Sequence, residues 1–91
     1  MPPAVLEIES MQPLEGELMS FYVDEALAVV GVPIVDLPFP EGSAATLIVR
    51  GQQLIAPKGN TELAVGDHVY ICARPADRPF IQLMFGRPEG E

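Results

Sequence analysis

The sequence predicts a small α+β domain: a mixed or antiparallel sheet of about five strands, a short helix and a C-terminal helix. Short segments in which apolar and polar residues alternate are separated by tight-turn residues, and an apolar segment near the C-terminus follows a helix-start pattern. The 91 residues make one domain, near the small end of what folds alone. We expect its core to span about 4–86, with tails at 1–3 and 87–91.

The first two strands are expected at Leu6–Glu9 and Leu18–Val23. In Leu6–Glu9, apolar and acidic residues alternate with the period of two that is typical of a half-buried strand. Turn-forming residues at Gln12–Gly16 separate the two strands. The next segment is ambiguous, because propensity alone also permits a helix over Glu25–Val30, ended by Gly31.

Three further strands are expected at Ala45–Arg50, Gln53–Ala56 and His68–Arg74. Gly51 can adopt a positive φ at little steric cost, which suits the first central position of a type II′ hairpin turn. The remaining turns are predicted at Pro57-Lys58-Gly59, which Thr61 and Asn60 would hold, and at Gly66-Asp67, which the Asp67 side chain would hold.

The last helix is predicted to begin at Asp77, a residue typical of an N-cap, with Pro79 in its first turn, and to continue to Phe85. Its apolar side chains surround the axis, and such a helix must be covered on both sides. We therefore expect a dimer interface that uses Phe80, Ile81, Met84 and Phe85. The alternative is that Ile81 and Phe85 cover the sheet of a monomer.

The net charge of −8 and the pI near 4.4 argue against a nucleic-acid-binding protein and against adhesion to an anionic membrane. No apolar run is long enough to insert into a bilayer, and the single cysteine, Cys72, indicates a reducing compartment. The hydrophobic fraction of 48% is high for a domain that can bury so little of its surface. We therefore expect a homodimer, or docking on a larger protein.

Catalytic chemistry is not expected. His68 follows Asp67 directly, and neighbouring strand residues point to opposite faces, so they cannot form an orienting pair. Glu7 and Glu9 share a strand face and could hold a hard cation, although a calcium site needs more oxygen ligands than these two carboxylates supply. A solvated polar face is the simpler interpretation, and we predict no metal site and no resident cofactor.

The order and spacing of these motifs resemble the RCK-C (TrkA-C) domain family. The resemblance is carried by Val29-Gly-Val-Pro-Ile-Val-Asp-Leu-Pro-Phe-Pro40 and by the segment from Leu47 to Ala73, with its Arg-Gly, Pro-x-Gly and Gly-Asp turns. The ending from Arg74 to Gly86 is similar to that of C-terminal domains in CPA1-type potassium/proton antiporters. The resemblance implies a loop through 26–30 and a short helix over about Val32–Leu37, with Pro33 in its first turn.

The resemblance also implies a function: a cytoplasmic regulatory and dimerisation domain, tethered to the inner membrane through the transporter portion of its parent protein. Relatives bind cyclic di-AMP between two subunits, which directs attention to Arg50, Leu54 and Ile55 as ligand-binding residues. The alternative for Arg50 is an exposed arginine that pairs with one of the acidic residues. A cation is a second candidate ligand. A stand-alone nucleotide-binding module and a purely structural dimerisation domain are the alternative functions.

Overall fold

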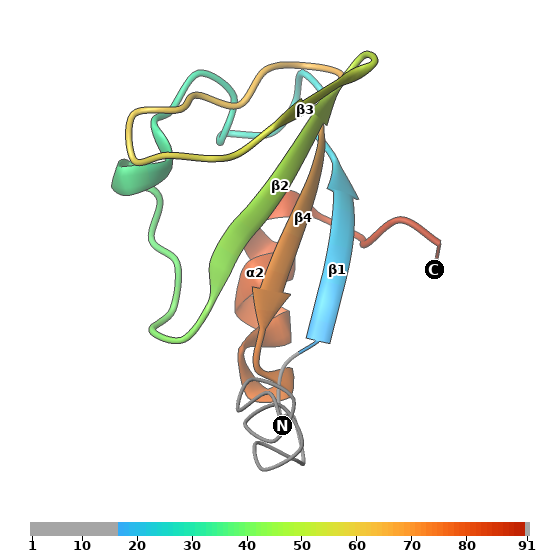
Figure 1. Ribbon diagram of the computed structural model, residues 1–91. Coiled ribbons are helices and arrows are strands. Elements are labelled where there is room, and N and C mark those ends of the chain that lie inside the picture. The colour runs from blue at the N-terminus through green and yellow to red at the C-terminus, as the bar shows by residue number, and fades with distance from the viewer. Residues whose placement is uncertain (1–16, 91) are drawn as a thin grey trace, which may run out of the picture.

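The computed structural model describes residues 17–90, and these form an antiparallel sheet of four strands with one α-helix against it (Figure 1). Along the sheet the strand order is β1-β4-β2-β3. The strands are β1 (Glu17–Tyr22), β2 (Ala44–Arg50), β3 (Gln53–Ile55) and β4 (His68–Ala73); the helices are η1 (Ile34–Asp36), η2 (Pro75–Asp77) and α2 (Arg78–Phe85). The predicted α+β class is confirmed. Four of the predicted strands are present, and the fifth, at Leu6–Glu9, lies outside the described residues.

The register of the sheet places one apolar row on the face that α2 covers. Phe21 of β1 is opposite Val69 of β4, and Val69 is in turn opposite Ile48 of β2. All three side chains are fully buried. The row follows from the period of two, because every second residue of each strand points to the same side. Between Ala45 and Leu47 the register with β4 shifts, which is the effect of a β-bulge.

The β2–β3 connection is the predicted tight hairpin turn. Gly51 has a φ of 61°, and Arg50 and Gln53, on either side of the turn, are paired across it. A positive φ at this position favours glycine, since a side chain there would be strained. The hairpin therefore places Arg50 at the end of β2, beside the turn.

The segment between β1 and β2 is mostly loop, so the helix considered at Glu25–Val30 is absent. The short helix is present but tighter than expected: it is the 3-10 helix η1, which directly follows Pro33. Isolated bridges join the loop to the segment before β4, pairing Val30 with Leu63 and Pro33 with Glu62. The backbone N–H groups of Gly31 and Ile34 donate to the carbonyls of Leu63 and Thr61, so this part of the loop finds its hydrogen-bond partners in another segment.

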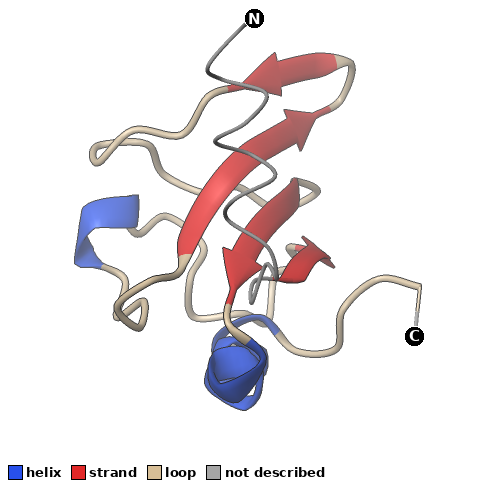
Figure 2. Ribbon diagram, turned by 60° about the horizontal axis from the view of Figure 1, so that its bottom comes forward, coloured by secondary structure: helices blue, strands red, loops and turns tan. Residues whose placement is uncertain are grey.

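Helix α2 lies against one face of the sheet (Figures 1 and 2). Its buried residues are Ile81 and Phe85, and the Phe85 ring is 5.3 Å from that of Phe21 between centroids. The assignment of Ile81 and Phe85 to a dimer interface was therefore wrong, since the chain's own sheet already buries both. Phe80 and Met84 remain partly exposed. Leu83, which is not among the residues predicted for the dimer interface, is 83% exposed.

Asp77 precedes α2 as predicted but does not cap it with its side chain. Its carboxylate instead pairs with the Arg74 guanidinium at 2.9 Å, across the 3-10 turn η2. Residues 87–90, which we expected to belong to a tail, pack on the domain. Pro88 is buried, and the Glu89 backbone N–H donates a hydrogen bond to the Ser20 carbonyl.

The buried face of α2 gives a first prediction. Ile81→Ala is expected to lower the free energy of unfolding by about 2–5 kcal/mol, because it leaves a cavity in a fully buried site. Leu54→Ala is the matched control and should change stability by less than about 0.5 kcal/mol, since its side chain on β3 is 73% exposed. Urea unfolding measures both. Equal losses in the two variants would contradict the assignment of the core to Ile81.

Candidate functional site

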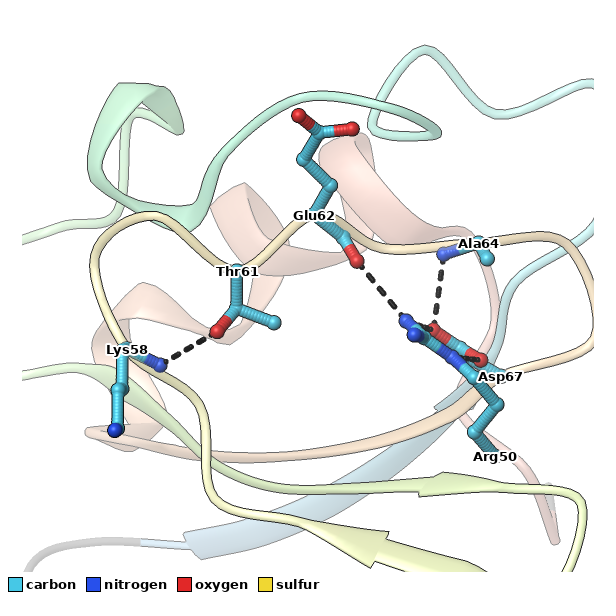
Figure 3. A network of polar contacts seen from close by, with 6 residues as sticks. All are labelled: Arg50, Lys58, Thr61, Glu62, Ala64 and Asp67. Atoms are coloured by element: carbon cyan, nitrogen blue, oxygen red, sulfur yellow. Dashed lines mark hydrogen bonds and ion pairs between the residues drawn. The ribbon is translucent and has the colours of Figure 1, made fainter.

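The Arg50 guanidinium binds the carboxylate of Asp67, the residue immediately before β4 (Figure 3). Arg50 Nε donates to Asp67 Oδ1 and Nη2 to Oδ2, both at 2.9 Å. Nη2 also donates to the Glu62 carbonyl at 3.0 Å. The fork of the guanidinium suits this two-point contact with a carboxylate. Because β2 and β4 are neighbours in the sheet, the end of one strand meets the beginning of the other.

Asp67 is fully buried and closes the turn that precedes it. Its Oδ2 accepts a hydrogen bond from the Ala64 backbone N–H at 2.9 Å, so the predicted role of Asp67 in the Gly66 turn is confirmed. The Thr61 hydroxyl similarly accepts one from the Lys58 N–H, as predicted (Figure 3). The loop from Lys58 to Asp67 is thus held by its own side chains and by Arg50.

The electrostatics of this pair favour both charged forms. Burial raises the pKa of Asp67, but hydrogen bonds from Arg50 and Ala64 and the charges of Arg50 and His68 outweigh it, and the pKa lies below its ordinary value. The hydrogen bond to Asp67 raises the pKa of Arg50, against a smaller opposing effect of burial. A buried charge left without its partner would be costly, so the Asp67 carboxylate depends on Arg50, whose own side chain is partly exposed.

The predicted ligand-binding residues lie on the paired strands β2 and β3. Arg50 is committed to Asp67, an acidic partner that we had not identified for it, while Leu54 is 73% exposed and Ile55 is half-buried on β3. Sequence reasoning missed the pair because Arg50 and Asp67 lie 17 positions apart and meet through strands that are not consecutive in the chain. The only signals of this pair in the sequence are an arginine at the end of one strand and a Gly-Asp turn before another.

His68 lies on the other face of the sheet from Asp67, as the alternation predicted. Its Nδ1 is 3.0 and 2.9 Å from the two Glu89 carboxylate oxygens. The ring also lies 5.3 Å from that of Tyr22, its partner across β1 and β4. The side chains of His68 and Glu89 both remain partly exposed. Its partner, Glu89, lies in the segment 87–91, which the sequence predicts to be a tail.

An apolar groove of about 480 Å³ runs beside α2. Its walls are the loop after β1, the chain just after η1, and the exposed side of the helix. Within the described residues only apolar side chains and their backbone line it: Ala26, Leu27, Ala28, Val29, Leu37, Pro38, Leu83 and Met84. Such a lining can bury an apolar group, and its size is within the range of small-molecule and peptide sites. Of the residues assigned from the sequence, Met84 alone lines it.

In residues 17–90, no group of three or more His, Cys, Asp or Glu side chains is placed to hold a metal ion. Glu7 and Glu9, the cation candidates, lie outside this range. None of the helices in the same range has the length and apolar character needed to cross a membrane.

Comparison with known proteins gives a family and a fold. The model of the TrkA-C domain matches residues 18–80. A solved structure described as "Structure of RCK domain with cda" superimposes with a TM-score of 0.64 at 18% identity, covering 75% of this chain and 96% of that one. The predicted RCK-C-like fold is thereby confirmed.

Curated relatives belong to archaeal potassium uptake systems. Trk system potassium uptake protein TrkA homolog 1 of Methanosarcina mazei is 31% identical over 70% of this chain and 15% of its own length. The TrkA homolog of Archaeoglobus fulgidus is 28% identical over 94% of this chain and 20% of its own length. The chain therefore spans no more than a fifth of these relatives.

The ion pair gives a second prediction. Arg50→Ala should lower the free energy of unfolding by about 1–3 kcal/mol at neutral pH, because it removes two hydrogen bonds from a buried carboxylate. The pKa of Asp67 is lowered by folding, so its stabilisation is complete above the ordinary value of 3.8 and is lost as the pH falls through the lowered value. The difference from wild type should accordingly shrink in acid.

Urea unfolding at about pH 7 and about pH 3 measures this difference. Arg74→Ala is the control: its ion pair is more exposed and should contribute less than about 1 kcal/mol. A loss for Arg50→Ala that matches the control, or that grows in acid, would contradict the role given to the pair.

Proposed function

Because the chain belongs to the TrkA-C domain family, as its motifs led us to expect, we propose that it is the regulatory domain of a potassium-transport protein and performs no catalysis itself. The observation that carries the proposal is the family match over residues 18–80. The names of the relatives, which are potassium uptake proteins, support it. Since the chain spans only a small part of those relatives, transport itself would belong to other parts of the parent protein.

For the parent we propose a cation/proton antiporter with this domain on its cytoplasmic side, tethered to the membrane through the transporter portion. Support comes from the segment Arg74–Gly86, which resembles the ending of CPA1-type antiporters. This segment comprises η2, α2 and the turn after it. It therefore supplies the exposed side of α2, which is where a regulatory contact would be made.

We further propose that the domain forms a homodimer through the groove and the exposed side of α2. Leu83 is 83% exposed and Phe80 42% exposed, and Leu83 stands at the groove that it helps to line. A projecting side chain beside a hollow suits a twofold contact, in which each copy fills the other's hollow. Dimerisation would bury these exposed apolar side chains and would account for the high hydrophobic fraction of the sequence.

Regulation would then be a shift between two arrangements of the dimer. A ligand changes such an equilibrium only by the difference in its affinity for the two arrangements. We propose a cyclic dinucleotide as that ligand, with a cation as the second candidate. Support for the first is the fold shared with an RCK domain solved with cda. Arg50 is a weak candidate for its contact, because the guanidinium already holds Asp67.

The dimer contact is tested by Leu83→Asp. A charge placed in an apolar contact should weaken dimerisation by at least about tenfold in Kd, which is about 1.4 kcal/mol. Leu54→Asp is the matched control, since Leu54 is a similarly exposed leucine on β3 and does not line the groove. Sedimentation equilibrium measures both. A wild-type chain that stays monomeric, or a loss confined to Leu54→Asp, would contradict the proposed interface.

The regulatory role is tested in the parent protein. Potassium-dependent proton flux is measured in inside-out membrane vesicles with the complete protein and with a version that ends before Glu17. Cyclic di-AMP at about 100 µM, a concentration that detects binding of about −5.5 kcal/mol, should change the flux of the complete protein alone. Magnesium and calcium ions form the cation arm of the experiment.

Two results would favour the alternative functions. Flux that is identical with and without the domain, although the isolated domain binds the nucleotide, favours a nucleotide-binding module with no regulatory role. A domain that dimerises but responds to none of these ligands favours a purely structural dimerisation domain.

A further inference from the structure

The segment after α2 crosses from one face of the sheet to the other. Phe85, the last residue of the helix, is buried on the core face against Phe21. Gly86 turns the chain with a φ of 85°, a conformation that favours glycine, and its N–H closes the helix on the Gln82 carbonyl. The chain then runs past the edge of the sheet at β1 (Figure 1). Glu89 meets side chains of the opposite face.

Glu89 is held at this edge by four interactions. Its backbone N–H donates to the Ser20 carbonyl of β1 at 2.7 Å. Its carboxylate accepts a hydrogen bond from the Ser20 hydroxyl and lies within hydrogen-bond distance of His68 Nδ1 through both oxygens. An ionised carboxylate can only accept, so His68 Nδ1 carries the hydrogen in this arrangement. Pro88, the preceding residue, is buried.

We propose that residues 86–90 form a latch that fastens the C-terminal end of α2 to the opposite face of the sheet, and that protonation of His68 tightens it. The neutral ring with a hydrogen on Nδ1 already donates to Glu89. A proton on its other nitrogen adds a net positive charge beside the carboxylate and strengthens the attraction. The attachment of the C-terminal end of α2 to the sheet thereby depends on pH.

The charged and titratable neighbours of His68 are few in the part of the chain that the structure describes. Glu89 approaches from the C-terminal segment, the Tyr22 ring lies beside it on β1, and Tyr70 follows on the same face of β4. Asp67, the preceding residue, is buried on the other side but is near enough for the charge of His68 to affect it. Glu89 is the neighbour whose side chain bonds the ring.

The lower pH limit of the latch is set by protonation of the Glu89 carboxylate. Burial raises the pKa of Glu89, but hydrogen bonds from Ser20 and His68, together with the charge of His68, lower it below 4.5. The contribution of Glu89 is therefore present above its ordinary value and is lost as the pH falls through the lowered one. Below that limit the carboxylate is neutral and its attraction to His68 is lost.

The attachment of the end of α2 affects the groove, because Leu83 and Met84 line the groove and are followed directly by Phe85 and Gly86. A loosened segment frees the last turn of the helix, and the wall that these two side chains form can then move. The latch is a property of the single chain and does not require the proposed dimer or its ligand.

The experiment is an NMR titration of the complete 91-residue chain between about pH 5 and about pH 8. The backbone amide signals of Glu89 and Gly90 should shift with the His68 ring signals along one curve. The methyl signals of Leu83 and Met84 should follow the same curve. Raising the salt from about 0.02 M to about 0.5 M should reduce all these shifts, because the pair is partly exposed and screened.

Two variants and a control decide the assignment. His68→Gln and Glu89→Gln should each abolish the titration shifts at residues 89–90 and at Met84, while the β-sheet signals remain those of the folded domain. Glu41→Gln removes a carboxylate from an exposed position before β2 and should leave the curve unchanged. Shifts at Glu89 that persist in His68→Gln would overturn the latch. Shifts at Glu89 without any at Leu83 or Met84 would overturn its coupling to the groove.

Discussion

The buried carboxylate of Asp67 is the constraint on which the arrangement of this domain depends. Its backbone carbonyl accepts a hydrogen bond from Val23 at the end of β1, and its side chain binds Ala64 in its own turn and Arg50 at the end of β2. One residue thus joins three segments that are distant in the sequence. The guanidinium offsets the cost of removing the carboxylate from water, and two-point contact defines how β2 and the loop meet.

The apolar residues of the chain are divided between a core and two partly open surfaces. The core row that includes Phe21, Ile48 and Val69 is sealed by Ile81 and Phe85 of α2. The outer side of the helix keeps Leu83 in solvent beside the groove, and Leu54 is exposed on β3. This division explains how a sequence with 48% hydrophobic residues forms only a small core. One side of α2 is buried against the sheet, and the other side keeps apolar residues exposed.

This division suits the regulatory role that we propose. The groove offers apolar contact. Its walls are the loop after β1, the chain just after η1 and one side of α2, and loops and short helices can move at a lower free-energy cost than the sheet. At the end of α2, the 86–90 segment reaches the other face of the sheet through Glu89, Ser20 and His68. Both features lie on the same eight-residue helix, so in our proposal a change at its C-terminal end is transmitted to a contact made along its side.

The sequence by itself determined the α+β class, the four described strands, the Gly51 turn and the helix that ends at Phe85, because alternation, turn chemistry and a helix-start pattern are local signals. It also placed Asp67 and His68 on opposite faces, which needs only the period of a strand. Only the tertiary structure decided that Ile81 and Phe85 belong to the core, that Arg50 serves Asp67, and that Glu89 returns to Ser20 and His68. Each of these depends on which non-consecutive segments become neighbours, and that is set by the strand order β1-β4-β2-β3 and the packing of α2, which no local pattern specifies.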